Sequence, residues 1–207
     1  MTAPEQPQIY LISPPQIELS TFPDLLAKVL DAQPIACMRL ALATQDEDRL
    51  SRAADACRAV AHARDVPIVI ADHIGLVDRL GLDGVHFAQA NASVRAARKD
   101  LGPDPIVGAF CGASRHDGMD AGEAGADYIA FGPTRDGGLG TAVAAPELFG
   151  WWSEMIELPV VAEGLLDTDV IAQLTPVTDF FALGEEVWST EDPVAALRTI
   201  QDAIANA

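Results

Sequence analysis

Short hydrophobic runs alternate with amphipathic helical segments along the whole chain, and this alternation restricts the fold more than any other feature. Eight strand–helix units follow one another, each about 25 residues long, which is typical of a (β/α)8 barrel. The runs are hydrophobic almost throughout, which indicates a parallel sheet buried on both faces. The expected strands are Gln8–Ser13, Ala36–Leu42, Pro67–Asp72, Gly84–Phe87, Ile106–Cys111, Tyr128–Gly132, Pro159–Glu163 and Phe180–Leu183. The expected helices are Phe22–Gln33, Asp46–Asp65, Ile74–Leu80, Ala92–Leu101, Gly118–Ala124, Pro146–Met155, Thr168–Leu174 and Asp192–Ala205.

The length of 207 residues suits one such barrel, so we expect a single α/β domain, a TIM barrel, over residues 1–207. An open flavodoxin-like or Rossmann sheet is the alternative, but no G-x-G-x-x-G motif follows the first expected strand. No apolar run approaches the roughly 20 residues that span a bilayer, and the first residues do not resemble a secretory signal. We therefore expect a soluble, cytoplasmic protein.

The net charge is −18, from 31 acidic and 13 basic residues. Nucleic acids and anionic membranes are bound largely through Lys and Arg, so we expect neither as a partner. The three cysteines, at positions 37, 57 and 111, show no C-x-x-C pair and no zinc spacing, which favours buried free thiols. Formation of a homo-oligomer is left open. The only two lysines are Lys28 and Lys99, and both fall in expected helices.

Functional residues of a (β/α)8 barrel lie at the C-terminal ends of the strands and in the loops that follow them. In this chain polar residues and glycine-rich turns occupy those positions. Backbone N–H groups in such turns can hold phosphate, although glycine in a tight turn also has a purely conformational explanation. The candidate substrate-binding residues are Arg39, Gln89, Gly132, Thr134, Arg135, Glu163, Gly164, Gly184 and Glu185.

Oxygen ligands gather at the ends of two neighbouring strands. Asp72 closes the third expected strand, and Gln89 and Asn91 follow the fourth. Neighbouring strand ends lie close together in a barrel, so these groups could share a hard cation such as Mg²⁺, which usually keeps waters and substrate phosphates. We therefore assign Asp72 and Asn91 as candidate metal ligands. The alternative is that Asp72 caps the helix after it.

Arg39, Cys111 and His116 are the candidate catalytic residues. His116 falls in the expected loop 112–118, where it could carry a proton, although an exposed loop histidine is equally ordinary. His86 lies within an expected strand, so we expect it to be packed or hydrogen-bonded rather than catalytic.

The ordered motifs resemble the thiamine phosphate synthase family, which includes the related thiazole tautomerase. The similarity runs through nearly the whole chain, and the pair DGVHxxQ and GADYxxFGP is its most specific part. The matching segments are YLIS, MRL, IVIAD, LDGVHFAQAN, IVGAFCGASRH, AGADYIAFGPT, PVVAEG and FFALGEEV.

The resemblance implies a transferase that joins hydroxymethylpyrimidine diphosphate to thiazole phosphate, with Mg²⁺ assisting the departure of diphosphate. The expected partner is thus a small phosphorylated substrate. Arg39 matches the arginine of the family's Q-L-R-x-K motif, Asp72 its first metal-binding aspartate, and Gln89 the glutamine of its fourth-strand motif. Gly164 matches the first glycine of the family's G-G-I phosphate turn.

Several charged and polar positions depart from the family pattern. The lysine of Q-L-R-x-K falls at Ala41 and its glutamine at Cys37, while the asparagine before Asp72 is Ala71. The second metal aspartate is Asn91. Other differences are Phe110 at the family's Gly-x-Ser turn, the lysine-free segment 134–141 at its T-x-T-K segment, Gly164-Leu165-Leu166 at its G-G-I turn, and Glu185 at a position that is usually a small hydroxyl.

Three hypotheses follow. The first is a working synthase with an atypical phosphate site that uses Arg39, Arg135, Mg²⁺ and loop N–H groups. The second is a thiazole-tautomerase-like enzyme with His116 or Cys111 as proton carrier. The third is a non-catalytic relative that binds a thiamine precursor or another protein. They differ in whether diphosphate binds at all.

Overall fold

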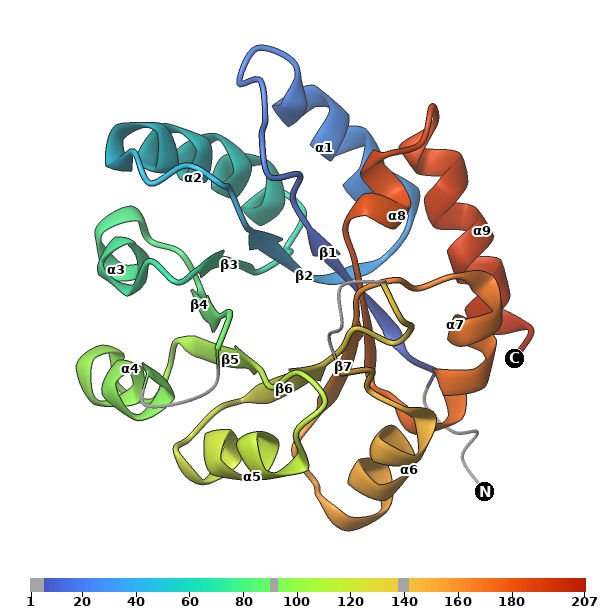
Figure 1. Ribbon diagram of the computed structural model, residues 1–207. Helices are drawn as coiled ribbons and strands as arrows, with labels where there is room; N and C mark the ends of the chain where they lie inside the picture. The colour runs from blue at the N-terminus through green and yellow to red at the C-terminus, as the bar shows by residue number, and fades with distance from the viewer. Residues whose placement is uncertain (1–5, 90–92, 138–141) are drawn as a thin grey trace.

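Eight parallel strands close into a barrel in sequence order, and β8 pairs with β1. The computed structural model describes residues 6–89, 93–137 and 142–207. Figure 1 looks along the barrel and shows the helices as an outer ring. The expected (β/α)8 barrel is confirmed. Its strands are β1 (Gln8–Ile12), β2 (Ile35–Leu40), β3 (Ile68–Ala71), β4 (Gly84–Phe87), β5 (Ile106–Phe110), β6 (Tyr128–Phe131), β7 (Val160–Glu163) and β8 (Phe180–Leu183).

The helices follow the strands in alternation, as the sequence pattern predicts. They are α1 (Phe22–Ala32), α2 (Glu47–His62), α3 (Val77–Leu80), α4 (Ser93–Leu101), α5 (Arg115–Glu123), α6 (Pro146–Met155), α7 (Thr168–Leu174), α8 (Glu185–Trp188) and α9 (Pro193–Ala205). Two 3₁₀ turns, η1 (Ile74–Leu76) and η2 (Thr175–Val177), precede α3 and follow α7. Among the described residues no helix is both long and apolar enough to cross a membrane.

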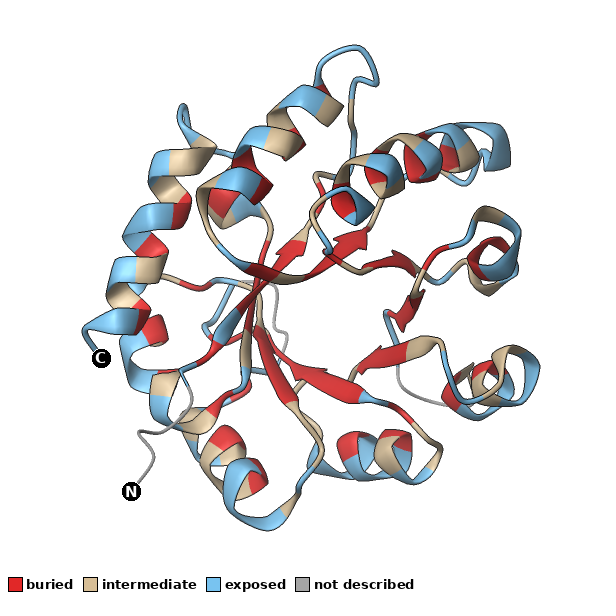
Figure 2. Ribbon diagram, turned by 180° about the vertical axis from the view of Figure 1, so that it is seen from behind, coloured by how far each residue is buried: buried red, intermediate tan, exposed pale blue. Residues whose placement is uncertain are grey.

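Buried side chains form two layers. One lies between the strands and the helices, so that buried residues line the inner side of each helix while the outer side is exposed (Figure 2). The other fills the barrel itself, because alternate side chains of each strand point inward. Its buried members are Tyr10, Cys37, Val69, Tyr128, Ala130, Val161 and Ala182.

Three aspartates anchor the N-terminal end of the barrel in the same way. Each precedes an even-numbered strand and accepts a hydrogen bond from a backbone N–H near the start of the preceding odd-numbered strand. The pairs are Asp83 with Ile68 (2.7 Å), Asp127 with Val107 (2.7 Å) and Asp179 with Val160 (2.8 Å). Residues at this end of a barrel generally serve stability, whereas the opposite end carries the chemistry.

Helix α5 begins earlier than the sequence interpretation placed it. Ser114 caps it, because its hydroxyl accepts a hydrogen bond from the N–H of Asp117 at 3.1 Å. Residues 115–117 therefore belong to the helix, and placing His116 in a loop was wrong. The short helix α8, which directly follows β8, was not expected.

Candidate active site

An ion pair crosses the mouth of the barrel between two strands that are not neighbours. Arg39 points inward from β2, and Glu163 is the last residue of β7; β1 and β8 lie between those strands. Nη2 of Arg39 lies 2.5 Å from Oε1 of Glu163, and the two side chains are 6% and 20% exposed. We call Arg39 and Glu163 the mouth pair. Sequence analysis selected both residues, and the structure brings them together.

The charges of the mouth pair depend on each other. Burial, the largest single influence, lowers the pKa of the Arg39 guanidinium, but the charge and hydrogen bond of Glu163, with smaller contributions from Tyr10 and Tyr128, together raise that pKa. Only one hydrogen bond joins the two groups. Nε of Arg39 and Oε2 of Glu163 are buried, and each lacks a hydrogen-bond partner among the described residues. The pair thus retains one unused donor and one unused acceptor.

A chain of hydrogen bonds lies beneath the mouth pair. The hydroxyls of Tyr10 and Tyr128 are 2.7 Å apart, and the Tyr128 hydroxyl lies 2.9 Å from Nδ1 of His86. Burial, with a further contribution from Arg39, lowers the pKa of His86, so its ring is neutral at pH 7. Burial also raises the pKa of both tyrosines. The predicted hydrogen bonding of His86 is confirmed, and Nε2 of this ring has no partner within the described part of the chain.

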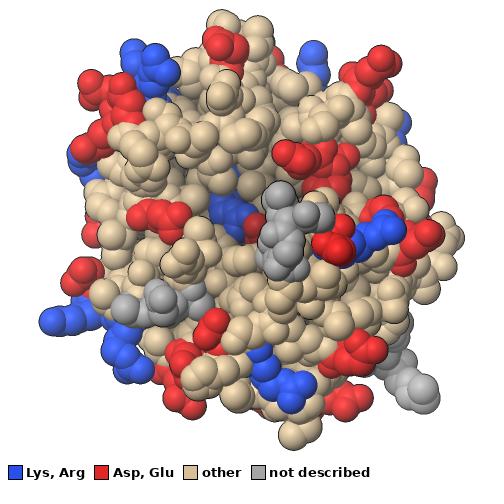
Figure 3. All heavy atoms as spheres, in the orientation of Figure 1, with Lys and Arg blue, Asp and Glu red and all other residues tan. Residues whose placement is uncertain are grey.

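Two cavities meet at the mouth pair. The inner cavity, of about 310 Å³, is bounded by the mouth pair, His86, Phe110 and three alanines at the ends of strands. The outer cavity, of about 630 Å³, extends from the mouth pair over the loops that follow β1, β7 and β8. Figure 3, in the orientation of Figure 1, shows a hollow near the centre of this face with basic and acidic atoms at its bottom. The small side chains of Ala41, Ala71 and Ala88 leave the inner cavity open.

The outer cavity reaches the two turns that sequence analysis assigned to phosphate. Gly164 and Gly184 both line it, but the carboxylate of Glu186 already binds the backbone there. Its Oε1 accepts a hydrogen bond from the N–H of Leu166 at 3.2 Å, and its Oε2 accepts one from the N–H of Gly184 at 3.0 Å. One backbone donor in each of these two turns is therefore already engaged by a side chain of the protein itself.

Backbone geometry fixes the loop between β6 and β7. A side chain at Gly132 would place its Cβ 1.9 Å from the carbonyl oxygen of Glu163, so only glycine allows this approach. Thr134 reinforces the contact, because its hydroxyl donates to the carbonyl oxygen of Gly164 at 2.8 Å. Leu165 has a φ of 58°, a left-handed conformation that is strained for a residue with a side chain. Gly132 and Thr134 thus position the turn, and neither lines the inner or the outer cavity.

Arg135 does not join the mouth pair. Its guanidinium forms an ion pair with Asp167, the N-cap residue of α7. Both residues line a separate cavity of about 350 Å³. Arg135 lines neither the inner nor the outer cavity, so it does not supply the charge of the missing lysines there.

The candidate cation site lies at the ends of β3 and β4. Asp72 is exposed, has a φ of 57°, and accepts a hydrogen bond from the N–H of Ala88 at 2.9 Å. This bond joins the two strand ends, so the alternative in which Asp72 caps the following helix is not what the structure shows. Gln89 is exposed nearby in the sequence, and Asn91 lies outside the described residues. One carboxylate with amide oxygens fits Mg²⁺ when substrate phosphates and water complete its ligands.

The two candidate proton carriers lie away from both cavities. Cys111 is buried and its thiol donates to the carbonyl oxygen of Ala109 at 3.7 Å. Burial, followed by the charge of Asp117, raises the pKa of this thiol to about 12. His116 is exposed on α5 and pairs with Asp120 at 3.3 Å. Neither residue lines the inner or the outer cavity, which removes the support for a tautomerase-like proton transfer.

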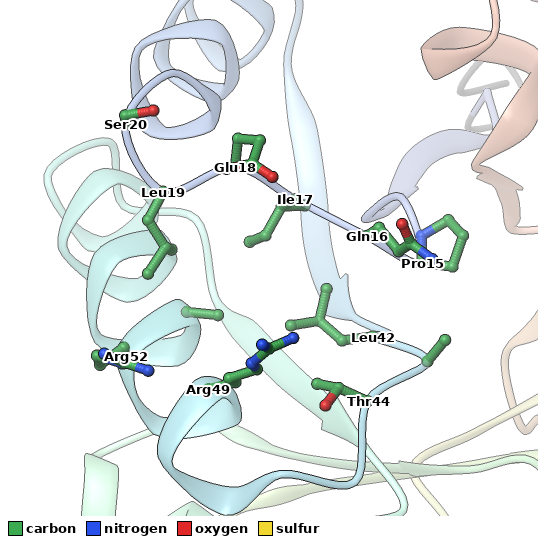
Figure 4. A pocket seen from close by; sticks show the side chains of 12 residues that line it. Pro15, Gln16, Ile17, Glu18, Leu19, Ser20, Leu42, Thr44, Arg49 and Arg52 are labelled. Atoms are coloured by element: carbon green, nitrogen blue, oxygen red, sulfur yellow. The ribbon is translucent and has the colours of Figure 1, made fainter.

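A further hollow, of about 710 Å³, lies at the rim of the barrel between segment 15–20 and the start of α2. Figure 4 shows Arg49 directed into it beside Ile17 and Leu42. Arg49 is mostly exposed and lies 3.9 Å from the carboxylate of Asp46. The hollow contains no buried charge, so we place the chemistry at the mouth pair instead.

Sequence reasoning missed three residues of the mouth. Glu186 could not be predicted, because its partners are backbone N–H groups, one of them in a loop far away in the sequence, and no sequence pattern indicates such a contact. Tyr10 and Tyr128 carried a detectable signal, since each is a polar aromatic at an inward position of a hydrophobic strand. Gly108 supports Tyr128, because a Cβ there would lie 2.0 Å from the tyrosine ring.

The chain is similar to known proteins over nearly its whole length. A family model described as thiamine monophosphate synthase matches residues 9–182. A thiamine-phosphate synthase of Rhodospirillum centenum is 39% identical over 194 residues, covering 92% of this chain and 94% of that protein. Another, of Hyphomonas neptunium, is 40% identical over 212 residues, with 96% of each chain covered.

Solved structures share the fold at lower identity. Thiamine phosphate pyrophosphorylase from Pyrococcus furiosus superposes with a TM-score of 0.83 at 18% identity, and 96% of each chain is covered. A 3-hexulose-6-phosphate synthase superposes with a TM-score of 0.73 at 15% identity, covering 95% of this chain and 99% of that one. The match of the family model over most of the sequence, together with relatives near 40% identity, shows that the chain belongs to the thiamine monophosphate synthase family.

Proposed function

We propose that the protein couples hydroxymethylpyrimidine diphosphate to thiazole phosphate in thiamine biosynthesis, releasing diphosphate. The observation that carries this proposal is the buried cation of Arg39 at the junction of two cavities. A reaction that joins two substrates needs two adjacent compartments. It also needs positive charge where the leaving group departs.

The two cavities suit the two substrates. The inner cavity is lined on one side by the ring of Phe110 and on another by Ala71 and Ala88. Asp72 follows Ala71 and accepts the hydrogen bond from Ala88, so this side of the cavity lies beside the candidate cation site. We assign the pyrimidine and its diphosphate to this side. The outer cavity contains the turns at Gly164 and Gly184, and we assign the thiazole phosphate to it. The bond between the two rings would then form beside the mouth pair.

Arg39 has to neutralise the leaving diphosphate without the help of lysines. Lys28 and Lys99 lie in the outer helices α1 and α4, and neither lines the inner or the outer cavity. Asp72, with Gln89 and Asn91 as further oxygen donors, would hold Mg²⁺. When bound there, the ion supplies the remaining positive charge for the departing diphosphate. Work in the cytoplasm on small phosphorylated substrates is part of the same proposal.

Calorimetric titration with hydroxymethylpyrimidine diphosphate, with and without Mg²⁺, tests the proposal. We expect binding that depends on Mg²⁺ and is weakened by Asp72→Ala. The matched control is Asp78→Ala, an exposed aspartate on α3, which should leave binding unchanged. A turnover assay with thiazole phosphate then measures formation of thiamine phosphate. Absence of binding at millimolar ligand would disprove the synthase function and leave a non-catalytic relative.

A further inference from the structure

The mouth pair places one positive and one negative group side by side where the two cavities meet. Both residues line both cavities, so whichever substrate arrives lies against the pair. The single hydrogen bond between Nη2 and Oε1 leaves Nε of Arg39 and Oε2 of Glu163 without partners among residues 6–89, 93–137 and 142–207. A buried donor or acceptor without a partner destabilises the free protein. These atoms are therefore suited to a ligand that needs a donor and an acceptor together.

The coupling reaction also creates one positive and one negative group side by side. The C–O bond between the methylene carbon and the diphosphate breaks, and the diphosphate leaves with the electron pair. The methylene carbon, conjugated with the pyrimidine ring, is left with a positive charge. The thiazole nitrogen then supplies its lone pair to form the C–N bond. For a moment the site contains an organic cation next to an anion.

We propose that Glu163 is a catalytic residue that stabilises the positive charge on the methylene carbon, while Arg39 stabilises the departing diphosphate. This inference rests on the proposed function. The carboxylate and the guanidinium are fixed in place before the reaction, and fixed charges aimed at developing charge lower a barrier without reorganisation. The ends of the mouth pair then match the two charges that the reaction creates.

A purely structural role explains the pair less well. A buried ion pair contributes little net stability, because removing both charges from water costs about as much as their attraction returns. Such a pair is most stable when all its donors and acceptors are hydrogen-bonded, yet in the described part of the chain Nε of Arg39 and Oε2 of Glu163 have no partner. Glu163 also lines both cavities, and 20% of its side chain is exposed, so that a ligand can reach it.

Two pyrimidines that differ only in charge test the assignment without turnover. The aminomethyl compound carries a protonated amine on the methylene carbon, one bond from the position of the cation, and the hydroxymethyl compound carries a neutral hydroxyl there. Calorimetry in the presence of inorganic diphosphate compares the two. We expect the wild-type protein to bind the cationic compound at least about tenfold more tightly, and Glu163→Gln to lose this preference. Glu154→Gln, an exposed residue on α6 with the same change of charge, should retain it.

Kinetics provide an independent test. Loss of one group that stabilises transition-state charge typically lowers kcat by about 100-fold or more. We expect that effect in Glu163→Gln with little change in KM, and a smaller loss in Glu163→Asp, which keeps the charge at a shorter reach. Thermal unfolding of each variant confirms that it is folded. Glu163→Asp also guards against the case in which Glu163→Gln fails to fold.

The outcomes separate the two proposals. Turnover by the wild-type protein without a preference for the cationic pyrimidine, or unchanged kcat in folded Glu163→Gln, overturns the role of Glu163 and leaves the synthase function standing. A preference that disappears in Glu163→Gln, in a protein without turnover, shows that Glu163 binds an organic cation, but it overturns the catalytic role together with the synthase function. Failure of the wild-type protein to bind either pyrimidine overturns both.

Discussion

Replacing Glu186 with glutamine should strengthen the binding of phosphate in the outer cavity. In the structure the Glu186 carboxylate accepts hydrogen bonds from the N–H groups of Leu166 and Gly184, at 3.2 and 3.0 Å. A phosphate that binds these turns must displace the carboxylate and then remain close to its negative charge. The variant removes that charge and one of the two competing acceptors.

The size of the effect follows from the separation of the charges. Two like charges about 5 Å apart repel by roughly 3 kcal/mol at an effective dielectric constant near 20, and by less than about 1 kcal/mol in bulk water. Glu186 is half-buried, so the relevant value lies between these limits. A gain of about 1–3 kcal/mol corresponds to binding that is roughly 5- to 150-fold tighter.

The assay is calorimetric titration of inorganic phosphate and of thiazole phosphate into wild-type protein, Glu186→Gln and Glu185→Gln. Glu185 lies one residue earlier, is exposed and lines the same cavity, so its variant reports the general effect of removing one negative charge. We expect a clearly larger gain for Glu186→Gln. Weaker phosphate binding in that variant would refute the reasoning. It would mean that the hydrogen bonds of the Glu186 carboxylate hold the two turns in the conformation that binds the ligand.

Other predictions concern stability and the residues outside the cavities. Cys111→Ala should retain wild-type turnover, because the thiol is buried and protonated; a loss above tenfold in a steady-state assay would contradict this. The free energy of unfolding should fall as the pH drops below about 6.5, by up to about 1.4 kcal/mol per unit. The reason is that burial lowers the pKa of native His86, so the unfolded chain takes up the proton first. Urea unfolding at pH 5.5 and 7.5 should therefore show a smaller change in the free energy of unfolding for His86→Gln than for the wild-type protein. Asp127→Ala should lose about 1–3 kcal/mol in urea unfolding, because the N–H of Val107 loses its acceptor, whereas the exposed Asp104→Ala should lose almost none.

The barrel could be predicted from the sequence because its signals are local. Each strand is a short hydrophobic run, and each helix has an apolar face, so the order of elements could be read directly. The start of α5 was misplaced because the glycines at 112 and 118 suggested a loop, and the cap at Ser114 was overlooked. The helix α8 is only four residues long, and its Glu186 contacts depend on the neighbouring β7 loop.

The site was predictable as a set of residues but not as a set of contacts. Arg39 and Glu163 were both selected, yet their pairing depends on the closure of the barrel, which sets β2 opposite β7 across the mouth. Sequence analysis named Glu163 only as a candidate substrate-binding residue. It assigned Arg135 to the phosphate site, although Asp167 binds it in the structure.

Two carboxylates bind groups that would otherwise be free to attract an anion at the mouth of this barrel. Glu163 binds the buried arginine, and Glu186 binds the two turns. Binding of phosphate is then an exchange in which one anion replaces another, rather than the filling of a positively charged site. In a lysine-lined site salt weakens phosphate binding, because it screens the attraction. Here the net charge of −18 repels the ligand, and salt screens that repulsion as well. The exchange and the screening act together, so phosphate affinity should depend little on ionic strength or rise with it, which is the opposite of the behaviour of a site built from lysines.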